Sequence, residues 1–126
     1  MKIFGIGVDI VEVNRIKSAI GRLPGFLKKV YTNNEINFCE SKNSTKFICY
    51  AERFAAKEAV AKSLKSGFGR NMSFNEIEVV NTISGEPVIN LYGETQKYFS
   101  SLGASEIKIS LSGIKKYAVA FAISII

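Results

Sequence analysis

The stretch FAAKEAVAKSL, residues 54–64, sets three charged side chains into an apolar, alanine-rich segment. Glu58 and Lys62 stand four residues apart in the favourable order, acid before base, so both lie on one helix face. Arg53 and Lys57 are also four apart and add positive charge to the segment. A Glu/Lys pair with this spacing is most often a solvated surface pair. The segment therefore predicts a helix whose functional meaning depends on what lies opposite its charged face.

The flanking residues extend this helix in both directions. Ser44 or Thr45 can cap its N-terminus, and Gly67 can end it in a left-handed conformation. Apolar residues at helical spacing form its packing face, namely Phe47, Tyr50, Ala51, Phe54, Ala55, Ala61 and Leu64. This pattern predicts a long central helix around which the rest of the fold packs.

A second acidic residue stands in unusual surroundings near the N-terminus. Asp9 follows FGIGV in the hydrophobic run from Ile3 to Val11, which is typical of a buried strand. A carboxylate there needs a partner, because an unpaired buried charge is costly. Asp9 can cap the next helix or accept backbone hydrogen bonds. Alternatively, Asp9 and Glu58 are ligands of a Mg²⁺ site, with Lys62 within reach of the same phosphates.

The pattern changes from helical to alternating in the second half of the chain. Ser84-Gly85 has the composition of a turn between two strands. Thr32 and Glu35 have capping-box spacing for a helix that reaches Glu40. Further helices are expected at 13–22, 26–30 and 93–102, and strands at 3–11, 74–79, 87–92, 107–112 and 117–125. These elements predict an α+β fold with a mostly antiparallel sheet packed on one long central helix.

Composition limits the classes of protein and of chemistry. With 126 residues, 47% of them hydrophobic and 22% charged, the chain has the size of one globular domain, 1–126. No apolar stretch is long enough to span a bilayer, so a cytoplasmic protein without a membrane partner is expected. Cys39 and Cys49 match no disulfide framework or metal motif, and free thiols are expected. The chain contains no histidine, which excludes Ser–His–Asp and Cys–His catalysis and histidine-ligated zinc.

The net charge of +6 indicates an anionic partner. Arg15, Arg22, Lys28 and Lys29 form a basic N-terminal surface, for which a solvated helix face is the alternative interpretation. A small RNA-binding module would also use such a surface. However, the chain has no RNP, KH or helix-turn-helix pattern, so no nucleic-acid partner is expected.

Five motifs occur in the order and approximate spacing of the bacterial holo-acyl-carrier-protein synthases, the small 4′-phosphopantetheinyl transferases. The motifs are GIGVDIVEVNRI (5–16), RFAAKEAVAKSL (53–64), SGFGRNMSFNEIEV (66–79), GEP (85–87) and SLSGIKKYAVA (110–120). This resemblance covers essentially the whole chain. It implies an α+β homotrimer with active sites between subunits. It also implies magnesium-dependent transfer of 4′-phosphopantetheine from coenzyme A to a serine of an acidic acyl carrier protein, in support of fatty acid biosynthesis.

The resemblance also implies residue roles. Asp9 matches the family's N-terminal magnesium aspartate, and Glu58 matches the magnesium glutamate of its KE motif. Arg53 and Lys62 match basic positions associated with coenzyme A phosphates, and Lys62 would stabilise the departing adenosine 3′,5′-bisphosphate. Glu58 or a metal-ordered water is the available base. The helical region that faces the carrier protein contains Arg15, Arg22, Phe26 and Lys29.

Two positions depart from the family pattern. The family usually has Ser-x-Ser/Thr-His near the C-terminus, whereas this chain has Gly113 in place of the histidine. Because that imidazole lies near the coenzyme A region in the family, the departure is expected to weaken coenzyme A binding without eliminating catalysis. An impaired member that binds carrier protein without efficient transfer is the alternative. Lys65 occupies a position where glycine is common.

Overall fold

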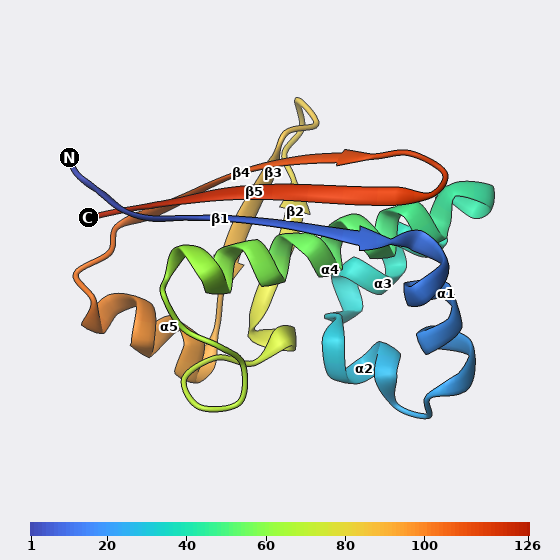
Figure 1. Ribbon diagram of the computed structural model, residues 1–126, viewed down its shortest axis with the longest axis horizontal. Coiled ribbons are helices and arrows are strands. Elements are labelled where there is room, and N and C mark those ends of the chain that lie inside the picture. The colour runs from blue at the N-terminus through green and yellow to red at the C-terminus, as the bar shows by residue number, and fades with distance from the viewer.

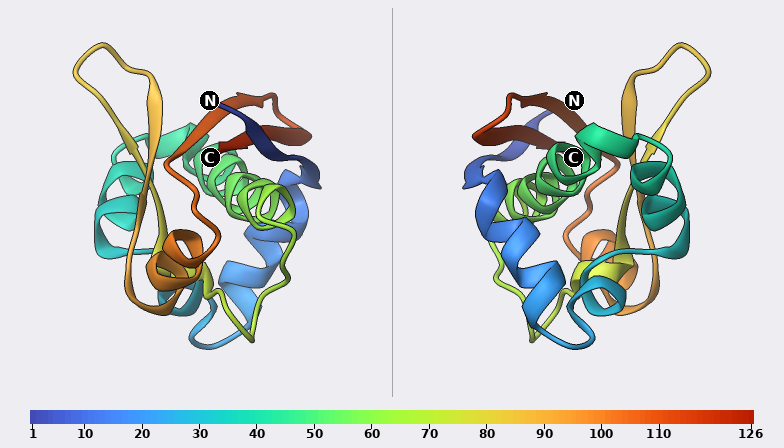
Figure 2. Two further views of the ribbon diagram at one scale, coloured as in Figure 1. Left: turned by 90° about the vertical axis from the view of Figure 1, so that its left-hand side faces the viewer. Right: turned by 90° about the vertical axis from the view of Figure 1, so that its right-hand side faces the viewer.

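The computed structural model describes residues 1–126 and contains two antiparallel sheets (Figure 1). The larger sheet has the strand order β1-β5-β4. The first and last strands of the chain, β1 and β5, therefore pair with each other, from Ile3 opposite Ile125 to Glu12 opposite Tyr117. The smaller sheet is a hairpin of two strands that projects from the body of the molecule (Figure 2). The strands are β1 (Ile3–Glu12), β2 (Ile77–Asn81), β3 (Pro87–Leu91), β4 (Glu106–Gly113) and β5 (Tyr117–Ile125).

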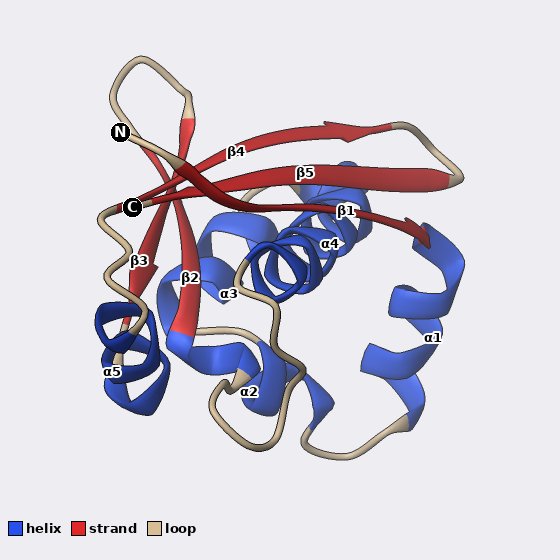
Figure 3. Ribbon diagram, turned by 60° about the vertical axis from the view of Figure 1, so that its left-hand side comes forward, coloured by secondary structure: helices blue, strands red, loops and turns tan.

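One long helix lies along the inner face of the larger sheet, and the shorter helices surround it (Figure 3). The helices are α1 (Val13–Arg22), α2 (Phe26–Val30), α3 (Asn33–Glu40), α4 (Lys46–Ser63) and α5 (Gly93–Ser101). The expected α+β architecture, with antiparallel strands packed on one long helix, is therefore confirmed. None of the helices is long and apolar enough to cross a membrane.

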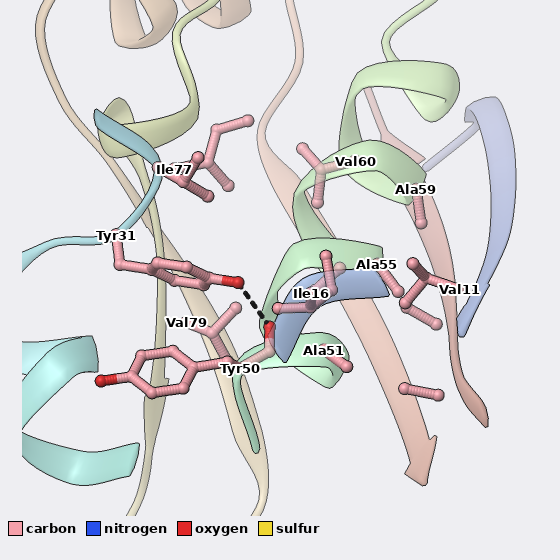
Figure 4. Packing of buried hydrophobic residues seen from close by; sticks show 14 of the residues in the cluster. Val11, Ile16, Tyr31, Tyr50, Ala51, Ala55, Ala59, Val60, Ile77 and Val79 are labelled. Carbon is pink, nitrogen blue, oxygen red and sulfur yellow. Dashed lines mark hydrogen bonds between the residues drawn. The ribbon is translucent and has the colours of Figure 1, made fainter. Parts of the chain in front are cut away.

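Small residues let α4 approach the sheet closely. A Cβ at Gly5 would overlap the carbonyl oxygen of Ser63, and a Cβ at Gly7 would overlap that of Ala59. Figure 4 shows the buried alanines of α4 at this packing, Ala51, Ala55 and Ala59. The strand β5 contributes the buried Ala118, Ala120 and Ala122 to the same core. The glycines near the N-terminus thus serve helix–sheet packing.

Gly7→Ala is expected to destabilise the protein by about 1–3 kcal/mol or more, because overpacking at a rigid contact forces the backbone to move. Gly21 in α1 is the matched control, since a Cβ there would meet no atom within 4 Å. Gly21→Ala should stabilise the protein by roughly 0.5–1 kcal/mol through helix propensity. Urea unfolding of the two variants measures both values, and equal stabilities would contradict this account of the helix–sheet contact.

A buried ion pair joins α4 to α3 and the hairpin. Lys57 is fully buried, and its Nζ donates to Glu35 Oε1 at 2.8 Å, to the carbonyl of Phe74 at 2.8 Å and to the carbonyl of Ile77. Glu35 Oε2 accepts a hydrogen bond from the backbone N–H of Val79 at 2.8 Å. Because Lys57, Glu35, Ile77 and Val79 are all buried, this network fixes the rotation of α4 about its axis.

The ends of α3 and α4 confirm some of the capping predictions and correct others. Thr32 and Glu35 form the predicted capping box at the start of α3. Thr45 is the N-cap residue of α4 but makes no side-chain capping bond. The left-handed residue after α4 is Lys65 (φ 60°), not Gly67. The N–H groups of Lys65 and Ser66 bond to the carbonyls of Lys62 and Ala61, closing a Schellman motif.

Two further expectations are corrected. Residues Phe74–Glu76 form a 3₁₀ turn rather than the start of a strand, and β2 begins at Ile77. Cys39 and Cys49 are not free thiols, because the structure joins them in a disulfide between α3 and α4 with their Cα atoms 5.4 Å apart. The ten-residue separation carried no motif, and only the packing of the two helices brings the cysteines together.

Candidate active site

Asp9, Glu58 and Lys62 come together where β1 crosses α4. Asp9 and Gly7 lie on the same, inward side of β1. Because Gly7 has no Cβ, the part of α4 that contains Ala59 and Lys62 can pack directly against the strand. Lys62 Nζ lies 3.2 Å from Asp9 Oδ1 and donates to the carbonyl of Val8 at 2.8 Å. The predicted charged face of the helix is therefore not simply solvated, because its lysine bonds to the strand.

Glu58 is held in an environment that disfavours its ionised form. Burial raises the pKa of the Glu58 carboxyl, the nearby Asp9 carboxylate raises it further, and Lys62 partly opposes both effects. Two carboxylates in one half-buried place repel each other unless a cation lies between them. Elevated pKa values of this origin are common at functional sites.

A cavity of about 480 Å³ opens beside the two carboxylates. Its lining includes Asp9 and Glu58 together with Arg15 of α1, Phe26 of α2 and Phe54 of α4. The structure thus brings two of the residues expected to face a carrier protein into the same hollow as the carboxylates. No group of three or more acidic or cysteine side chains in the chain is arranged to hold a metal ion, so this site offers two carboxylates.

The other two expected docking residues lie outside that hollow. Arg22 lines an adjoining hollow on α1 together with Arg15. Lys29 is exposed on α2 and lines neither of these hollows. The basic residues therefore form a surface that begins at the carboxylates and continues over α1 and α2.

Arg53 is buried and lies on the opposite side of α4 from Lys62. Nine residues at 3.6 per turn correspond to two and a half turns, so the two side chains leave the helix in opposite directions. Arg53 Nη2 donates to Asn81 Oδ1 at 2.7 Å, and the guanidinium lies 4.4 Å from the centre of the Phe38 ring. Its Nε has no hydrogen-bond partner although it is buried. Within one chain, Arg53 and Lys62 do not share a site.

Arg53 lines a separate cavity of about 450 Å³ between α4, the hairpin and β4. Lys42 and Glu52 also line this cavity, although neither residue belongs to the predicted site. No sequence signal marks them, because their proximity to Arg53 depends on how the hairpin and β4 pack against α4. Lys57 is the opposite case, since it is expected to add positive charge to the helix together with Arg53 but is fully buried against Glu35.

The family model of the 4′-phosphopantetheinyl transferase superfamily matches residues 5–122, which include Asp9, Arg53, Glu58 and Lys62. The chain belongs to this superfamily. The transferase is 47% identical over 121 residues to the holo-[acyl-carrier-protein] synthase of Ruminiclostridium cellulolyticum, a match that covers 94% of this chain and 89% of the relative.

Solved structures agree with this family assignment. The transferase superposes on the holo-[acyl-carrier-protein] synthase of Neisseria meningitidis with a TM-score of 0.87 at 28% identity, covering 98% of both chains. It also superposes on the synthase of Bacillus anthracis in complex with CoA (3′,5′-ADP), with a TM-score of 0.79 at 35% identity, covering 97% of this chain and 96% of that one. The expected membership of the holo-acyl-carrier-protein synthases is thus confirmed, and the transferase is an enzyme of this type.

Gly113, at the position where the resemblance places a histidine, lies against α4 in this transferase. A Cβ at Gly113 would be 2.7 Å from Ile48 Cγ2 and 2.9 Å from Glu52 Oε2. A side chain can be introduced here only if these neighbours move. The departure at Gly113 therefore involves a second position, Glu52, that the sequence motif does not include.

Proposed function

We propose that this chain transfers 4′-phosphopantetheine from coenzyme A to a serine of an apo-acyl carrier protein. The transfer releases adenosine 3′,5′-bisphosphate and supports fatty acid biosynthesis in the cytoplasm. The observation that carries the proposal is the cluster of Asp9, Glu58 and Lys62 beside a solvent-open cavity, in a chain of this superfamily. Its relatives are named holo-[acyl-carrier-protein] synthases, and one related structure contains CoA, which supports the acceptor and the substrate.

The donor set fits Mg²⁺, which proteins commonly hold through one or two carboxylates while waters and substrate phosphates complete the octahedron. Asp9 and Glu58 would supply these carboxylates, and their mutual repulsion gives the site an affinity for a cation. When bound, the ion would neutralise charge that develops on the pyrophosphate of coenzyme A.

Lys62 and Glu58 have distinct roles in this proposal. Lys62, whose ammonium is half-exposed beside Asp9, would bind the phosphate of the departing adenosine 3′,5′-bisphosphate. The attacking serine hydroxyl must lose a proton, and the chain has no histidine to accept it. The raised pKa of Glu58 suits a proton acceptor. An ordered water that passes the proton to solvent is the alternative acceptor.

The position of Arg53 supports an active site shared between subunits. If Arg53 and Lys62 contact phosphates of one coenzyme A, the two residues must come from different copies, because they lie on opposite faces of α4. An apolar outer face of the large sheet offers a surface for association. Its exposed members are Ile6, Val8 and Ile10 of β1 and Tyr117 and Phe121 of β5. Exposed apolar patches of this kind mark interaction sites.

A homotrimer should therefore be the species present at micromolar concentration, as measured by sedimentation equilibrium. Asp9→Asn and Arg53→Ala variants, each inactive alone, should recover activity when their subunits are mixed, since one site in every mixed trimer then has both native residues. A monomer with full activity would contradict the shared site. So would mixtures that remain inactive despite subunit exchange.

Charge reversal at Arg15 and Arg22 should weaken use of the carrier protein much more than binding of coenzyme A. Both residues lie on the basic surface of α1 beside the proposed site, where charged groups mainly speed encounter with an acidic partner. The Arg15→Glu/Arg22→Glu variant should raise the KM for carrier protein on the order of tenfold or more. The control for the same change in net charge is Lys97→Glu/Lys108→Glu, because both lysines are exposed on α5 and β4. A parallel loss of both affinities would contradict a selective docking role.

A carrier-protein binder without efficient transfer is the second candidate function, and Gly113 is the observation that favours it. The two candidates differ in product formation. Chromatography should detect adenosine 3′,5′-bisphosphate only when coenzyme A, Mg²⁺ and apo-carrier protein are all present. Binding of carrier protein without release of the bisphosphate would support the second candidate.

A further inference from the structure

The cavity around Arg53 contains a carboxylate that the proposed mechanism does not use. Glu52 lines this cavity together with Arg53 and Lys42. Burial raises the pKa of the Glu52 carboxyl, and the charge of Arg53 alone opposes that rise, with no hydrogen bond to either oxygen. Glu52 is thus a half-buried acid whose only compensation is the neighbouring guanidinium.

Arg53 in turn has an incomplete set of partners. Its hydrogen bonds go to the neutral Asn81 amide and to the Cys49 sulfur, and its buried Nε has none. Burial lowers the pKa of Arg53, while the charges of Glu35 and Glu52 oppose this effect. An unpartnered nitrogen on a buried cation that lines a cavity indicates an anionic ligand. Any such ligand would also meet the Glu52 carboxylate.

The Glu52 carboxylate occupies space beside Gly113 that is open because residue 113 has no side chain. Its Oε2 lies 2.9 Å from the position that a Cβ of residue 113 would occupy. A larger residue at 113 and the present position of Glu52 therefore exclude each other. This chain has an anion at the edge of the cavity where the family motif would supply an imidazole.

The phosphate that reaches this cavity follows from the proposed function, on which this inference rests. Asp9, Glu58 and Lys62 would take the pyrophosphate of coenzyme A, and Arg53 lies on the other face of α4. The group left for Arg53 is the second phosphate of the substrate, on the ribose 3′ oxygen.

We propose that Glu52 is a specificity-determining residue that opposes binding of this 3′-phosphate at Arg53. It lowers the preference of the enzyme for coenzyme A over the analogue with a free 3′ hydroxyl. A like charge close to a ligand phosphate selects against it without affecting groups bound elsewhere.

Calorimetric titration of the full-length protein with adenosine 3′,5′-bisphosphate and with AMP, both with Mg²⁺, tests this role. Glu52→Gln should tighten binding of the bisphosphate on the order of tenfold and that of AMP by less than about twofold. Glu52→Ala should also tighten binding of the bisphosphate, which would show that the effect does not depend on the glutamine amide of Glu52→Gln. Glu94→Gln is the matched control for net charge, because Glu94 is exposed on α5 and pairs only with Lys97. Thermal unfolding verifies that each variant is folded.

Equal tightening of both nucleotides by Glu52→Gln, or no change in either, would overturn the role of Glu52. If the protein without substitutions still transfers phosphopantetheine to apo-carrier protein in that case, the proposed function stands and only this inference fails. If the unmodified protein binds neither nucleotide and transfers nothing, the proposed function fails and this inference falls with it.

Discussion

Asp9→Asn and Glu58→Gln should each reduce phosphopantetheine transfer on the order of 10³-fold or more, with the fold intact. Each change removes one of the two carboxylates that converge beside the cavity, and electrostatic stabilisation of developing charge is commonly the largest catalytic contribution. Stability should change by no more than about 1 kcal/mol, because Asp9 and Lys62 are partly solvated and their ion pair is worth little. Loss of the mutual repulsion between the carboxylates would even favour folding.

The rate of transfer at saturating coenzyme A, measured with urea unfolding of the same samples, separates the two effects. Glu94→Gln serves as the control, since it removes an exposed carboxylate with the same change in net charge. If Asp9→Asn retains more than about a tenth of the native rate, Asp9 does not act as a ligand in catalysis, and the pairing of the two carboxylates is structural.

Lys57→Met should destabilise the protein by about 3–5 kcal/mol, because it leaves the Glu35 carboxylate buried without its cation. The buried carbonyl of Ile77 and the partly buried carbonyl of Phe74 also lose their donor. Burial already lowers the pKa of Lys57, with Glu35 opposing this shift, so the ammonium depends on its partners to stay charged. The loss should be visible as a shift of the urea midpoint at fixed protein concentration.

Lys62→Met on the same helix is the matched control for Lys57→Met, because Lys62 is half-exposed. It should change stability by less than about 1 kcal/mol while impairing transfer. The double variant Lys57→Met/Glu35→Gln should recover part of the stability, since no charge then remains buried. Equal destabilisation by Lys57→Met and Lys62→Met would show that the buried pair does not hold α4 in place.

The fold could be predicted largely from local pattern. Helix α1 and strand β5 occur at the predicted residues, because hydrophobic periodicity is clear in both segments. The end of α4 could not be predicted, since Gly67 is the better left-handed residue by intrinsic preference. Packing instead places Lys65 in that conformation, and Lys65 Nζ lies 4.4 Å from the centre of the Phe4 ring. Tertiary contacts here override a local rule.

The candidate site divides in the same way. Asp9 could be predicted because a carboxylate in a hydrophobic run is anomalous, although β1 proves to be buried on one face only. Glu58 and Lys62 could be predicted because their spacing fixes a common helix face. The burial of Arg53 and the proximity of Glu52 could not, because they depend on the hairpin and β4, which are distant in sequence. The Cys39–Cys49 contact likewise depends on the packing of α3 against α4, for which ten residues of spacing give no signal.

The intact mass of an apo-acyl carrier protein, after incubation with this protein, coenzyme A and Mg²⁺, tests the proposed transfer most directly. The account predicts an increase corresponding to one phosphopantetheine group on a single serine. It predicts no increase on the same timescale with Asp9→Asn or without Mg²⁺. An unchanged carrier mass with the native protein, under conditions in which the two proteins bind each other, would contradict it.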